Sequence, residues 1–450
     1  MTEPLSARPS ATPIRPSACP GLLRIVPALD GGICRIKLPG GVLSAEQALA
    51  VADAAEGFAG GVIEATNRGN LQIRGIGADH DGLIASLLDA GLGPSNPASD
   101  DVRNLMLSPT AGIDPQQLLD VRPLAGQILH SLEHHPRFYE LSPKFALSLD
   151  GGEGLAMLEH PHDLWLSPLQ VDGQTLLGFG FAGCPATDSP VAAVAPDAAH
   201  ALVVAVLETF LNLARPEHAR MRDLLKEVPV ARLIEHVAAR LPQRLVIDQK
   251  VTDWRRSPTR SFAHIGTYSQ ATVGIMAVGA GVPLGRLRPS MLREAARLAI
   301  AFGDGQLCMT PWQSLMLRNV PAGHSVTVME GLSQAGLLVD AAQSLSKIVA
   351  CTGSAACAKG LADTKADALH LAALLQENAI SRAVHLSGCA RSCAAAHVMP
   401  VTLLAASPGR YDLYFRHAEM SGFGDLHARD LTIEAVGALL TADSRSNTDD

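Results

Sequence analysis

The sequence predicts an α+β fold built from two copies of one module, and three observations support this prediction. A shift of 244 residues places residues 43–74 on residues 287–318 without a gap. Each copy combines apolar residues at helical spacing, a glycine turn and two short segments joined by a polar turn. The chain also has 450 residues, of which 47% are hydrophobic, which is enough for two or three domains with their own cores.

Each copy of the repeat reads as a strand, a helix and two further strands. The first strand is expected at residues 32–38 in one copy and at residues 272–278 in the other. Ser44 suits the N-cap of the first helix, and Pro289 suits the first turn of the second. Because a unit of this kind leaves its sheet edges open, we expect the two units to pair. The alternative is a coincidental register between segments rich in Ala and Leu.

The same shift continues beyond the repeat, although few residues are identical. It places residues 103–108 on 347–352 and residues 141–149 on 385–393. In this register Phe145 matches Cys389 and Leu149 matches Cys393. The register predicts a duplicated module whose second copy keeps thiols while the first keeps cationic side chains.

Two pairs of cysteines near the C-terminal end form a candidate metal site: Cys351 with Cys357, then Cys389 with Cys393. A cubane 4Fe-4S cluster needs four thiolates that converge from at least two loops, which this pattern can supply. The spacings are unlike the two-residue spacing typical of zinc knuckles. Gly353 and Gly388 lie beside the pairs, which predicts a close approach of backbone to a bulky group. Zinc and unpaired core thiols are the alternatives.

Composition and charge exclude several other classes of protein. The net charge of −8 predicts no nucleic-acid partner and no anionic membrane surface. The first twenty residues are rich in Pro, Ser and Ala and contain no apolar run, so we expect no signal peptide. Residues 201–214 are the most apolar stretch, but they are short for a membrane span and include Glu208. We therefore expect a cytoplasmic protein with no membrane contact, in which cysteines bind metal rather than form disulfides.

The other four cysteines have no ligand-like spacing and are expected to be core or tail thiols: Cys19, Cys34, Cys184 and Cys308.

The cysteine pattern, the duplication and the segment ATNRGNLQIRG together resemble the sirohaem-dependent nitrite and sulfite reductases. The resemblance runs from about residue 22 to residue 440. It implies two ferredoxin-like half-domains paired together, plus two mixed α/β domains of the nitrite/sulfite reductase type around a tetrapyrrole and a 4Fe-4S cluster. It also implies that the four cysteines hold this cluster, and that Cys393 bridges to the tetrapyrrole iron.

The resemblance and the repeat together predict six segments. They are a disordered tail (1–20), a ferredoxin-like half-domain (21–85), a reductase-type α/β domain (86–250), a second ferredoxin-like half-domain (258–325), a cluster-binding α/β domain (326–440) and a second disordered tail (441–450).

Five residues match positions at which the family binds its tetrapyrrole: Arg68, Gln72 and Arg74 in TNRGNLQIR, Arg103 in DDVRNL and Lys144 in SPKFA. A sirohaem-type ring carries eight carboxylates. Guanidinium groups bind carboxylates through two parallel hydrogen bonds and stay charged when buried. The resemblance therefore implies that these five residues bind the ring, whether it is a cofactor or a substrate. A surface charge is the alternative for any single one of them.

One departure from the reductases lies at Ala146, where they place the second lysine of a Lys-x-Lys pair. Loss of that ammonium weakens both anion binding and the supply of protons. The chain is also shorter than a typical assimilatory reductase. Both features, together with the N-terminal ACPGLLRIVPALDGGICRIKLPGG, resemble the precorrin-3B synthase branch of the same family. That branch implies a monooxygenase of aerobic cobalamin biosynthesis.

The synthase branch implies conversion of precorrin-3A, with dioxygen and reductant, to hydroxylated, γ-lactone-bearing precorrin-3B. The ring pocket then holds either sirohaem or the substrate itself, and in the second case a mononuclear non-haem iron would activate oxygen. No glycine-rich dinucleotide motif follows a predicted strand, so NADH would act through a partner, either a reductase or a ferredoxin. A nitrite or sulfite reductase and a non-catalytic tetrapyrrole carrier are the alternatives.

The sequence identifies no catalytic residue. The histidines that stand near candidate positions are expected to be solvated or hydrogen-bonded: His130, His134, His135, His385 and His397. Arg391, between the last two cysteines, is a candidate for shielding the charge of the cluster.

Overall fold

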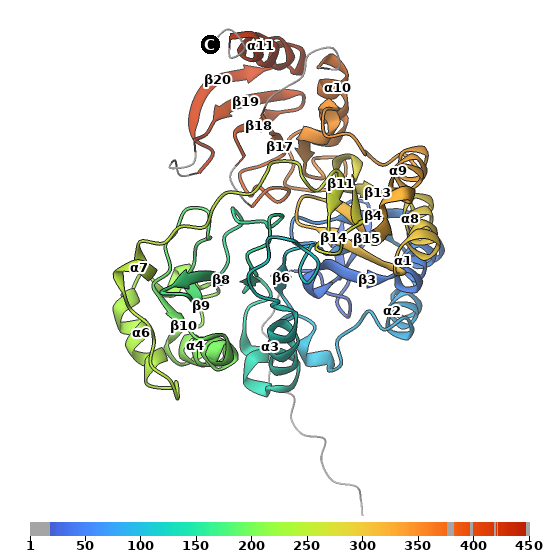
Figure 1. The fold of residues 1–450 in the computed structure, drawn as a ribbon. Coiled ribbons are helices and arrows are strands. Elements are labelled where there is room, and N and C mark those ends of the chain that lie inside the picture. Colours follow the sequence, from blue (N-terminus) through green and yellow to red (C-terminus); the bar gives the residue numbers. More distant parts are fainter. Residues whose placement is uncertain (1–18, 376–381, 397–398, 418–419, 421, 447–450) are drawn as a thin grey trace, which may run out of the picture.

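The structure is a computed structural model that describes residues 19–375, 382–396, 399–417, 420 and 422–446. Its strands form four five-stranded sheets, two in the ferredoxin-like units and two in the larger α/β units. Figure 1 shows the C-terminal sheet apart from the other three, with helices α10 and α11 packed against it. The mixed α+β class predicted from the sequence is confirmed.

The first ferredoxin-like sheet has the strand order β1-β2-β5-β4-β13. Helices α1 (Ala45–Phe58) and α2 (His80–Asp89) belong to this unit. Its strands are β1 (Val26–Ala28), β2 (Gly31–Ile36), β5 (Leu71–Ile76), β4 (Val62–Ala65) and β13 (Arg286–Leu287). The capping box at Ser44 and the Pro at the start of α8 (Pro289–Phe302) confirm the predicted helix starts.

The second ferredoxin-like sheet has the order β11-β12-β15-β14-β3. Helices α8 and α9 (Ser325–Gln334) belong to this unit. Its strands are β11 (Gly266–Ser269), β12 (Ile275–Gly281), β15 (Ser314–Pro321), β14 (Gln306–Thr310) and β3 (Val42–Ser44).

The two ferredoxin-like units pair by exchanging an edge strand. Strand β13, from the second unit, pairs with β4 of the first, with Leu287 opposite Ile63. Strand β3, from the first unit, pairs with β14 of the second, with Leu43 opposite Leu307. Helices α1 and α8 contribute to one shared apolar core, so neither unit has its own closed core. Each open edge is thus covered by its partner, which is the reason we expected the units to pair.

The first α/β unit contains the sheet β10-β9-β8-β7-β6. Its strands are β6 (Leu105–Leu107), β7 (Leu147–Leu149), β8 (Leu164–Val171), β9 (Gln174–Phe181) and β10 (Ala192–Val194). Its helices are α3 (Arg122–His134), α4 (Ala199–Leu213), α5 (Met221–Leu224), α6 (Val230–Ala238) and α7 (Gln249–Thr252).

The C-terminal α/β unit contains the sheet β16-β17-β18-β19-β20. Its strands are β16 (Ile348–Ala350), β17 (Val384–Ser387), β18 (Val401–Ser407), β19 (Arg410–Phe415) and β20 (Asp425–Leu431), and its helices are α10 (Thr364–Leu374) and α11 (Ile433–Ser446). In both α/β sheets the first three strands in sequence order pair in parallel. The fourth strand pairs antiparallel with the third, and the fifth pairs antiparallel with the fourth. This shared topology extends the duplication to the larger units.

The offset between equivalent elements is not constant, which corrects one part of the sequence register. Helices α1 and α8 are 244 residues apart at both ends, but β7 and β17 begin only 237 residues apart. Leu149 pairs with Leu107 as Leu386 pairs with Ala350, so Leu149 matches Leu386 and not Cys393. The predicted match of Phe145 with Cys389 is wrong for the same reason. The connections between strands have different lengths in the two halves, and the ungapped shift fails there.

Among the described residues, one helical segment, Pro196–Leu213, is long and apolar enough to cross a membrane by length and composition. We expected this stretch to be too short, but a 3₁₀ turn at Pro196–Ala198 continues directly into α4 and lengthens it. Half of the segment is buried, and Leu202, Val206 and Phe210 pack in the core of the first α/β unit. Such burial is typical of a core helix.

Candidate functional site

The four predicted cluster ligands lie on two loops at the same edge of the C-terminal sheet. Cys351 directly follows β16, and Cys389 follows β17 after one glycine. These two strands are parallel neighbours, so the loops that leave their carboxyl ends lie side by side. The backbone N–H of Gly388 donates to the Cys351 sulfur at 3.1 Å, which joins the two loops directly.

The four thiols lie close enough for their charges to act on one another. Burial raises the pKa of the Cys393 thiol, and the charges of the other three cysteines raise it further. Arg391 opposes this rise, which is consistent with the shielding role expected for it. Within the part of the chain that the structure describes, no group of three or more His, Cys, Asp or Glu side chains is arranged to hold a single metal ion. A donor set made only of converging thiols on two loops fits a 4Fe-4S cluster.

Three glycines allow the cysteine loops to pack tightly. Gly353 has a φ of +68°, and a Cβ there would meet the carbonyl of Ala362 at 2.6 Å. A Cβ on Gly388 would lie 3.2 Å from the Cα of Gly360 and 3.4 Å from the Cys351 sulfur. The approach of Gly353 and Gly388 to a bulky group stays a prediction. In the structure both pack closely against neighbouring backbone, which brings the cysteine loops together.

The loop that carries Cys393 lies between the two halves of the molecule. The side-chain amide of Asn67, in the turn between β4 and β5, donates to the Cys393 carbonyl at 3.3 Å. The side-chain amide of Gln313, in the equivalent turn between β14 and β15, donates to the Ala394 carbonyl at 3.1 Å. Two turns related by the duplication therefore hold adjacent peptide groups. A thiol at this position is available to a group bound between the halves.

A cationic face from the first ferredoxin-like unit lies beside Cys393. Residues alternate along β2, so Cys34 and Ile36 enter the apolar core while Arg35 lies on the opposite face. Arg35 is opposite Gln72 on β5, whose side-chain oxygen, when turned toward it, accepts from the Arg35 Nε at 2.9 Å. The Cys393 charge acts on Arg35, whose pKa is nevertheless lowered by burial.

Arg68 belongs to the same cationic face. Burial lowers the pKa of its guanidinium to about 10, and the positive charges of Arg220 and Arg35 lower it further. Its side chain is still partly exposed, so the group lies in an enclosed place that solvent reaches. Three guanidinium groups that repel one another are held here, and this arrangement favours an anionic ligand.

Arg220 and His162 also contribute to this face, and neither was identified from the sequence. The Arg220 Nε donates to both oxygens of Asp163 at 2.9 and 2.7 Å. Asp163 also accepts from the backbone N–H of Ala146 at 2.8 Å. Arg220 is therefore fixed beside position 146, where the reductases are expected to have a second lysine.

His162 is kept neutral, since burial lowers its pKa to about 3 and Arg68 lowers it further. Its Nδ1 donates to the His160 carbonyl at 2.7 Å, so the buried Nε2 carries a lone pair, which has no hydrogen-bond partner in the structure.

Lys37 was also missed, and it lies next to the predicted site residue Arg103. The Lys37 ammonium is buried and donates to the Asp100 carbonyl at 2.7 Å. Burial lowers the pKa of Lys37 to about 7. Arg103 is buried with its Nε 3.6 Å from a Glu133 carboxylate oxygen, while Nε and one terminal nitrogen make no hydrogen bond in the structure. Arg103 therefore keeps donor nitrogens for a ligand, and Lys37 lies beside it.

The remaining predicted residues differ in their surroundings. Arg74 is buried, pairs with both oxygens of Asp30 at 3.0 and 2.9 Å, and donates to the Ala356 carbonyl in the first cysteine loop at 3.2 Å. These contacts give Arg74 a role in holding that loop, and they lend no support to ring binding. Lys144 is exposed.

The histidines named from the sequence give no further ligand where the structure describes them. His134 Nδ1 lies 2.9 Å from the His130 carbonyl, and the two rings stack at 4.2 Å. His385 is buried in β17, and His397 lies outside the described residues.

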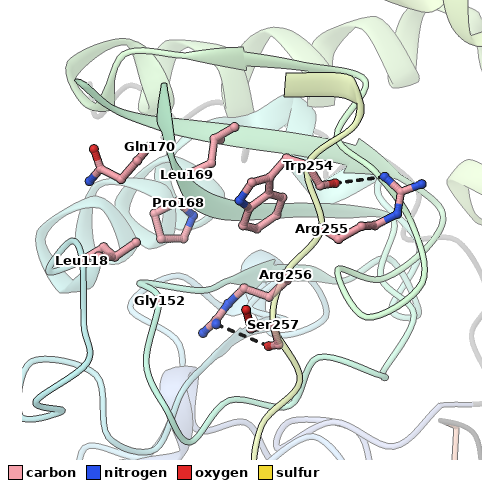
Figure 2. Close-up of a pocket in the computed structure, with 9 residues that line it drawn as sticks. All are labelled: Leu118, Gly152, Pro168, Leu169, Gln170, Trp254, Arg255, Arg256 and Ser257. Atoms are coloured by element: carbon pink, nitrogen blue, oxygen red, sulfur yellow. Dashed lines mark hydrogen bonds between the residues drawn. The ribbon is translucent and has the colours of Figure 1, made fainter. Parts of the chain in front are cut away.

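A cavity of about 230 Å³ lies in the first α/β unit, away from these groups. Figure 2 shows Trp254 and Arg256 on one side of it and Pro168 and Leu118 on the other. None of its lining residues is a predicted site residue, so the cavity is separate from the cysteine loops.

Comparison with known proteins identifies the family. A model of the nitrite/sulfite reductase ferredoxin-like half domain matches residues 27–90 and 268–335, and a model of the nitrite and sulphite reductase 4Fe-4S domain matches residues 98–245. The chloroplastic ferredoxin–nitrite reductase of Zea mays is 31% identical over 389 residues, which cover 82% of this chain and 68% of that protein. The chain belongs to the nitrite and sulfite reductase family.

The relatives of the chain carry the names of different activities. The chloroplastic ferredoxin–nitrite reductase of Spinacia oleracea is 29% identical over 82% of this chain and 65% of its own length. A precorrin-3B synthase of Sinorhizobium is 24% identical over 88% of this chain and 82% of its own length. The structure of the Mycobacterium tuberculosis NirA protein matches 92% of this chain and 80% of its own with a TM-score of 0.78 at 21% identity, which shows a shared fold. The chain thus spans about two thirds of the plant nitrite reductases it matches.

Membership in the nitrite and sulfite reductase family makes the protein an oxidoreductase relative and supports an iron–sulfur cluster in it. The 4Fe-4S domain model matches the first α/β unit, whereas the four converging thiols lie in the C-terminal unit of the same topology.

Proposed function

We propose that this protein is a precorrin-3B synthase, an iron–sulfur monooxygenase that acts on a tetrapyrrole with several carboxylates. The observation that carries the proposal is the cationic face of Arg35, Arg68 and Arg220 beside Cys393. Two carboxylates act on this face: Asp163 on Arg68 and Asp101 on Arg35. Asp163 is already paired with Arg220 and Asp101 with Arg24, so the face has room for further anions, which a carboxylated ring supplies.

The overall reaction adds one oxygen atom to the ring. Precorrin-3A, dioxygen, two electrons and two protons give precorrin-3B and water, and one new ring substituent is a hydroxyl. The lactone closes when an acetate carboxylate oxygen bonds to the oxidised ring, a step favoured because the carboxylate is already part of the substrate. A cluster on the four cysteines would supply electrons singly.

The residues of the chain bind, orient and supply protons in this proposal. Arg68 and Arg220 bind peripheral carboxylates, and Asp163 keeps Arg220 in place. Lys37, whose pKa is about 7, is suited to donate a proton to the oxygen that leaves as water. His162 offers a neutral acceptor at Nε2, and its Nδ1–H···O=C bond is the arrangement that metal-binding histidines use.

Ala146 favours the synthase over an oxyanion reductase. Its side chain is buried, and the one lysine of the motif, Lys144, is exposed. Reduction of a small oxyanion benefits from several cations around the reacting oxygen atoms, and this chain offers fewer of them there. The match to the Sinorhizobium synthase also extends over most of both chains.

The second candidate is a nitrite or sulfite reductase with sirohaem as its resident ring. It is favoured by identities of 29–31% to ferredoxin–nitrite reductases, above the 24% to the synthase. In that case the cationic face binds the carboxylates of sirohaem. In the synthase the pocket holds either sirohaem or the substrate with a separate mononuclear iron. A ferredoxin or a reductase would donate electrons in either case, with NADH acting only through such a partner.

The deciding experiment is incubation of the anaerobically purified protein with precorrin-3A, an artificial electron donor and then dioxygen. The proposal predicts a product heavier by one oxygen atom, with the label retained from ¹⁸O₂. Reduction of nitrite or sulfite without any change to precorrin-3A would instead support the reductase. Stoichiometric ring binding with neither activity would leave a carrier.

A further inference from the structure

A buried ionic network contacts the first cysteine loop at three points. The Lys365 ammonium donates to the Ala350 carbonyl at 3.4 Å, immediately before Cys351. The Thr352 hydroxyl donates to Glu64 at 3.2 Å, and Arg74 donates to the Ala356 carbonyl at 3.2 Å. The network therefore touches the loop before, within and at the end of the segment that joins Cys351 to Cys357.

Glu64 is the centre of this network. Its carboxylate lies 3.7 Å from the Lys365 ammonium, 3.8 Å from Arg74 and 3.4 Å from Arg286. Burial acts to raise the pKa of Glu64, but the three cations together lower it, so the carboxylate is ionised. The three cations come from β5, β13 and α10, so the network also joins the two halves and the exchanged strand.

Lys365 is fixed beside a cluster-ligating thiol. Its ammonium is buried and donates to the Leu284 carbonyl at 2.5 Å. The preceding residue, Thr364, donates to the Cys351 carbonyl at 2.7 Å and lies 3.5 Å from the Cys351 sulfur. The charge of Cys351 is among those that act on Lys365. Two carbonyls and Glu64 hold the ammonium in place, so its position does not depend on one partner.

Buried charges next to an iron–sulfur cluster change its reduction potential. Reduction adds one negative charge, which a nearby ammonium stabilises and a nearby carboxylate destabilises. Solvent screens such effects at the surface but much less in the interior. A buried ion pair is also costly to maintain relative to apolar packing, so its presence at this loop is not explained by stability alone.

We propose that Lys365 and Glu64 form a charge pair that sets the reduction potential of the cluster, with Lys365 raising the potential and Glu64 lowering it. The inference rests on the proposed function only in requiring a cluster on the four cysteines. It holds for either reaction of the ring. Both residues act on the cluster through the electric field, without contact with the substrate.

The test is an EPR-monitored redox titration of the full-length protein and two single variants. Lys365→Gln is expected to shift the cluster potential downward, and Glu64→Gln is expected to shift it upward. A loosened loop would expose the cluster to water in both variants and shift both potentials in the same direction. Opposite shifts therefore identify an electrostatic effect. The double variant Glu64→Gln/Lys365→Gln is expected to return toward the wild-type potential.

Two controls accompany these variants. Lys359→Gln removes an exposed lysine from the same cysteine loop and is expected to shift the potential several times less than Lys365→Gln. Lys365→Arg keeps the positive charge, so its cluster potential is expected to stay close to that of the wild type. Shifts of the same sign, or no shift with iron and sulfide content intact, would overturn the inference. Absence of any cluster from the wild-type protein would overturn the proposed function instead.

Discussion

The two halves of the molecule have the same topology but carry different chemistry on equivalent loops. In the C-terminal half, the loops after β16 and β17 bring four thiols together. In the first half, the loops after β6 and β7 carry the acids Asp114, Asp150 and Glu153. Asp150 pairs with Arg256 at 2.7 Å, and Asp114 accepts from the hydroxyl of Tyr268 at 2.8 Å. Glu153 accepts from the backbone N–H of Gly151 at 2.7 Å, so these three acids form a polar cluster with groups of their own surroundings.

The turns that face these loops also differ between the halves: the turn of the first half is charged, and the turn of the second half is apolar. The sequence shift places Trp312 on Arg68 and Met316 on Gln72. Trp312 stacks on the buried His264 with ring centroids 4.8 Å apart, and Met316 packs in an apolar cluster with Leu155 from the first-half loops. The second turn therefore fills its place with apolar side chains, where the first turn presents guanidinium groups.

The difference shows how one site arises from a duplicated chain. Each half contributes a turn that faces loops of the other half, and Arg74 and Arg318 mark this relation by donating to the Ala356 and Ala111 carbonyls, respectively. The cationic turn of the first half meets the thiols of the second. The apolar turn of the second half packs on the first-half loops that carry the acids. We interpret the former as the functional site and the latter as a structural interface.

The largest expected effect is loss of the cluster when Cys393 is replaced by serine. Iron and acid-labile sulfide measured after anaerobic purification should fall to near background, because the site needs four thiolates. Cys308→Ala is the matched control, since this thiol is buried in the apolar interface. That control should keep its iron at a cost of about 1 kcal/mol in stability. Equal iron content in the wild type and in Cys393→Ser would contradict the interpretation of the thiol loops as the functional site.

The next effect is weaker binding of a carboxylated ring in Arg68→Gln. Loss of one charge-assisted hydrogen-bonding group is worth about 1.5–3 kcal/mol, so the Kd for uroporphyrin should rise about ten- to a hundredfold. Fluorescence titration measures it. Arg222→Gln, which removes an exposed arginine near Arg220, should bind as the wild type does. A similar loss in both variants would show that only the net charge matters.

A smaller effect is a pH dependence of ring binding that Lys37 controls. Its pKa of about 7 means that the ammonium is charged below pH 7 and neutral above it. Ring affinity in the wild type should therefore weaken as pH rises through about 7. The same titration with Lys37→Met should show a flatter profile. An unchanged pH profile in this variant would remove Lys37 from the binding face.

The smallest effect concerns the acidic loops of the first half. Burial, and then the charge of Asp150, raises the pKa of Glu153 from 4.5 to about 9. The stability that this carboxyl contributes is present below pH 4.5 and is lost as pH rises through 9, because the folded state retains a proton that the unfolded state releases. Glu153→Gln has no carboxyl to titrate and does not lose this stability. The melting temperature of the variant minus that of the wild type should therefore rise by a few degrees between pH 5 and pH 9. A difference that stays constant with pH would contradict the pKa shift.

Much of the fold could be predicted because its signals are local and repeated. The helix starts at Ser44 and Pro289 follow from capping chemistry, and a 244-residue shift aligns α1 with α8 at both ends. The register failed at β7 and β17 because connections of different length carry no periodic signal. The exchange of β3 and β13 was also not predicted, since strands of two or three residues have too few positions to show alternation.

The site was predicted where its residues belong to short motifs. The four cysteines and Arg68 lie in such motifs, and the structure brings Arg35 and Lys37 close to Arg68 and Arg103. Alternation along β2 and into Lys37 was a usable signal for Arg35 and Lys37, because the residues that alternate with them, Cys34 and Ile36, face the core. His162 and Arg220 gave no signal. They reach the site through loops far apart in the chain, and only the fold brings them together.

The most direct test of the central claim is the EPR spectrum of the reduced protein with and without a bound carboxylated ring. If the thiols hold a cluster beside the cationic face, the wild type will contain about four sulfides and at least four irons per chain, since sirohaem or a mononuclear site adds iron, and ring binding will change the cluster signal. The change will be absent in Arg68→Gln at the same ring concentration. A cluster signal that stays identical with the ring fully bound to the wild type would contradict the account.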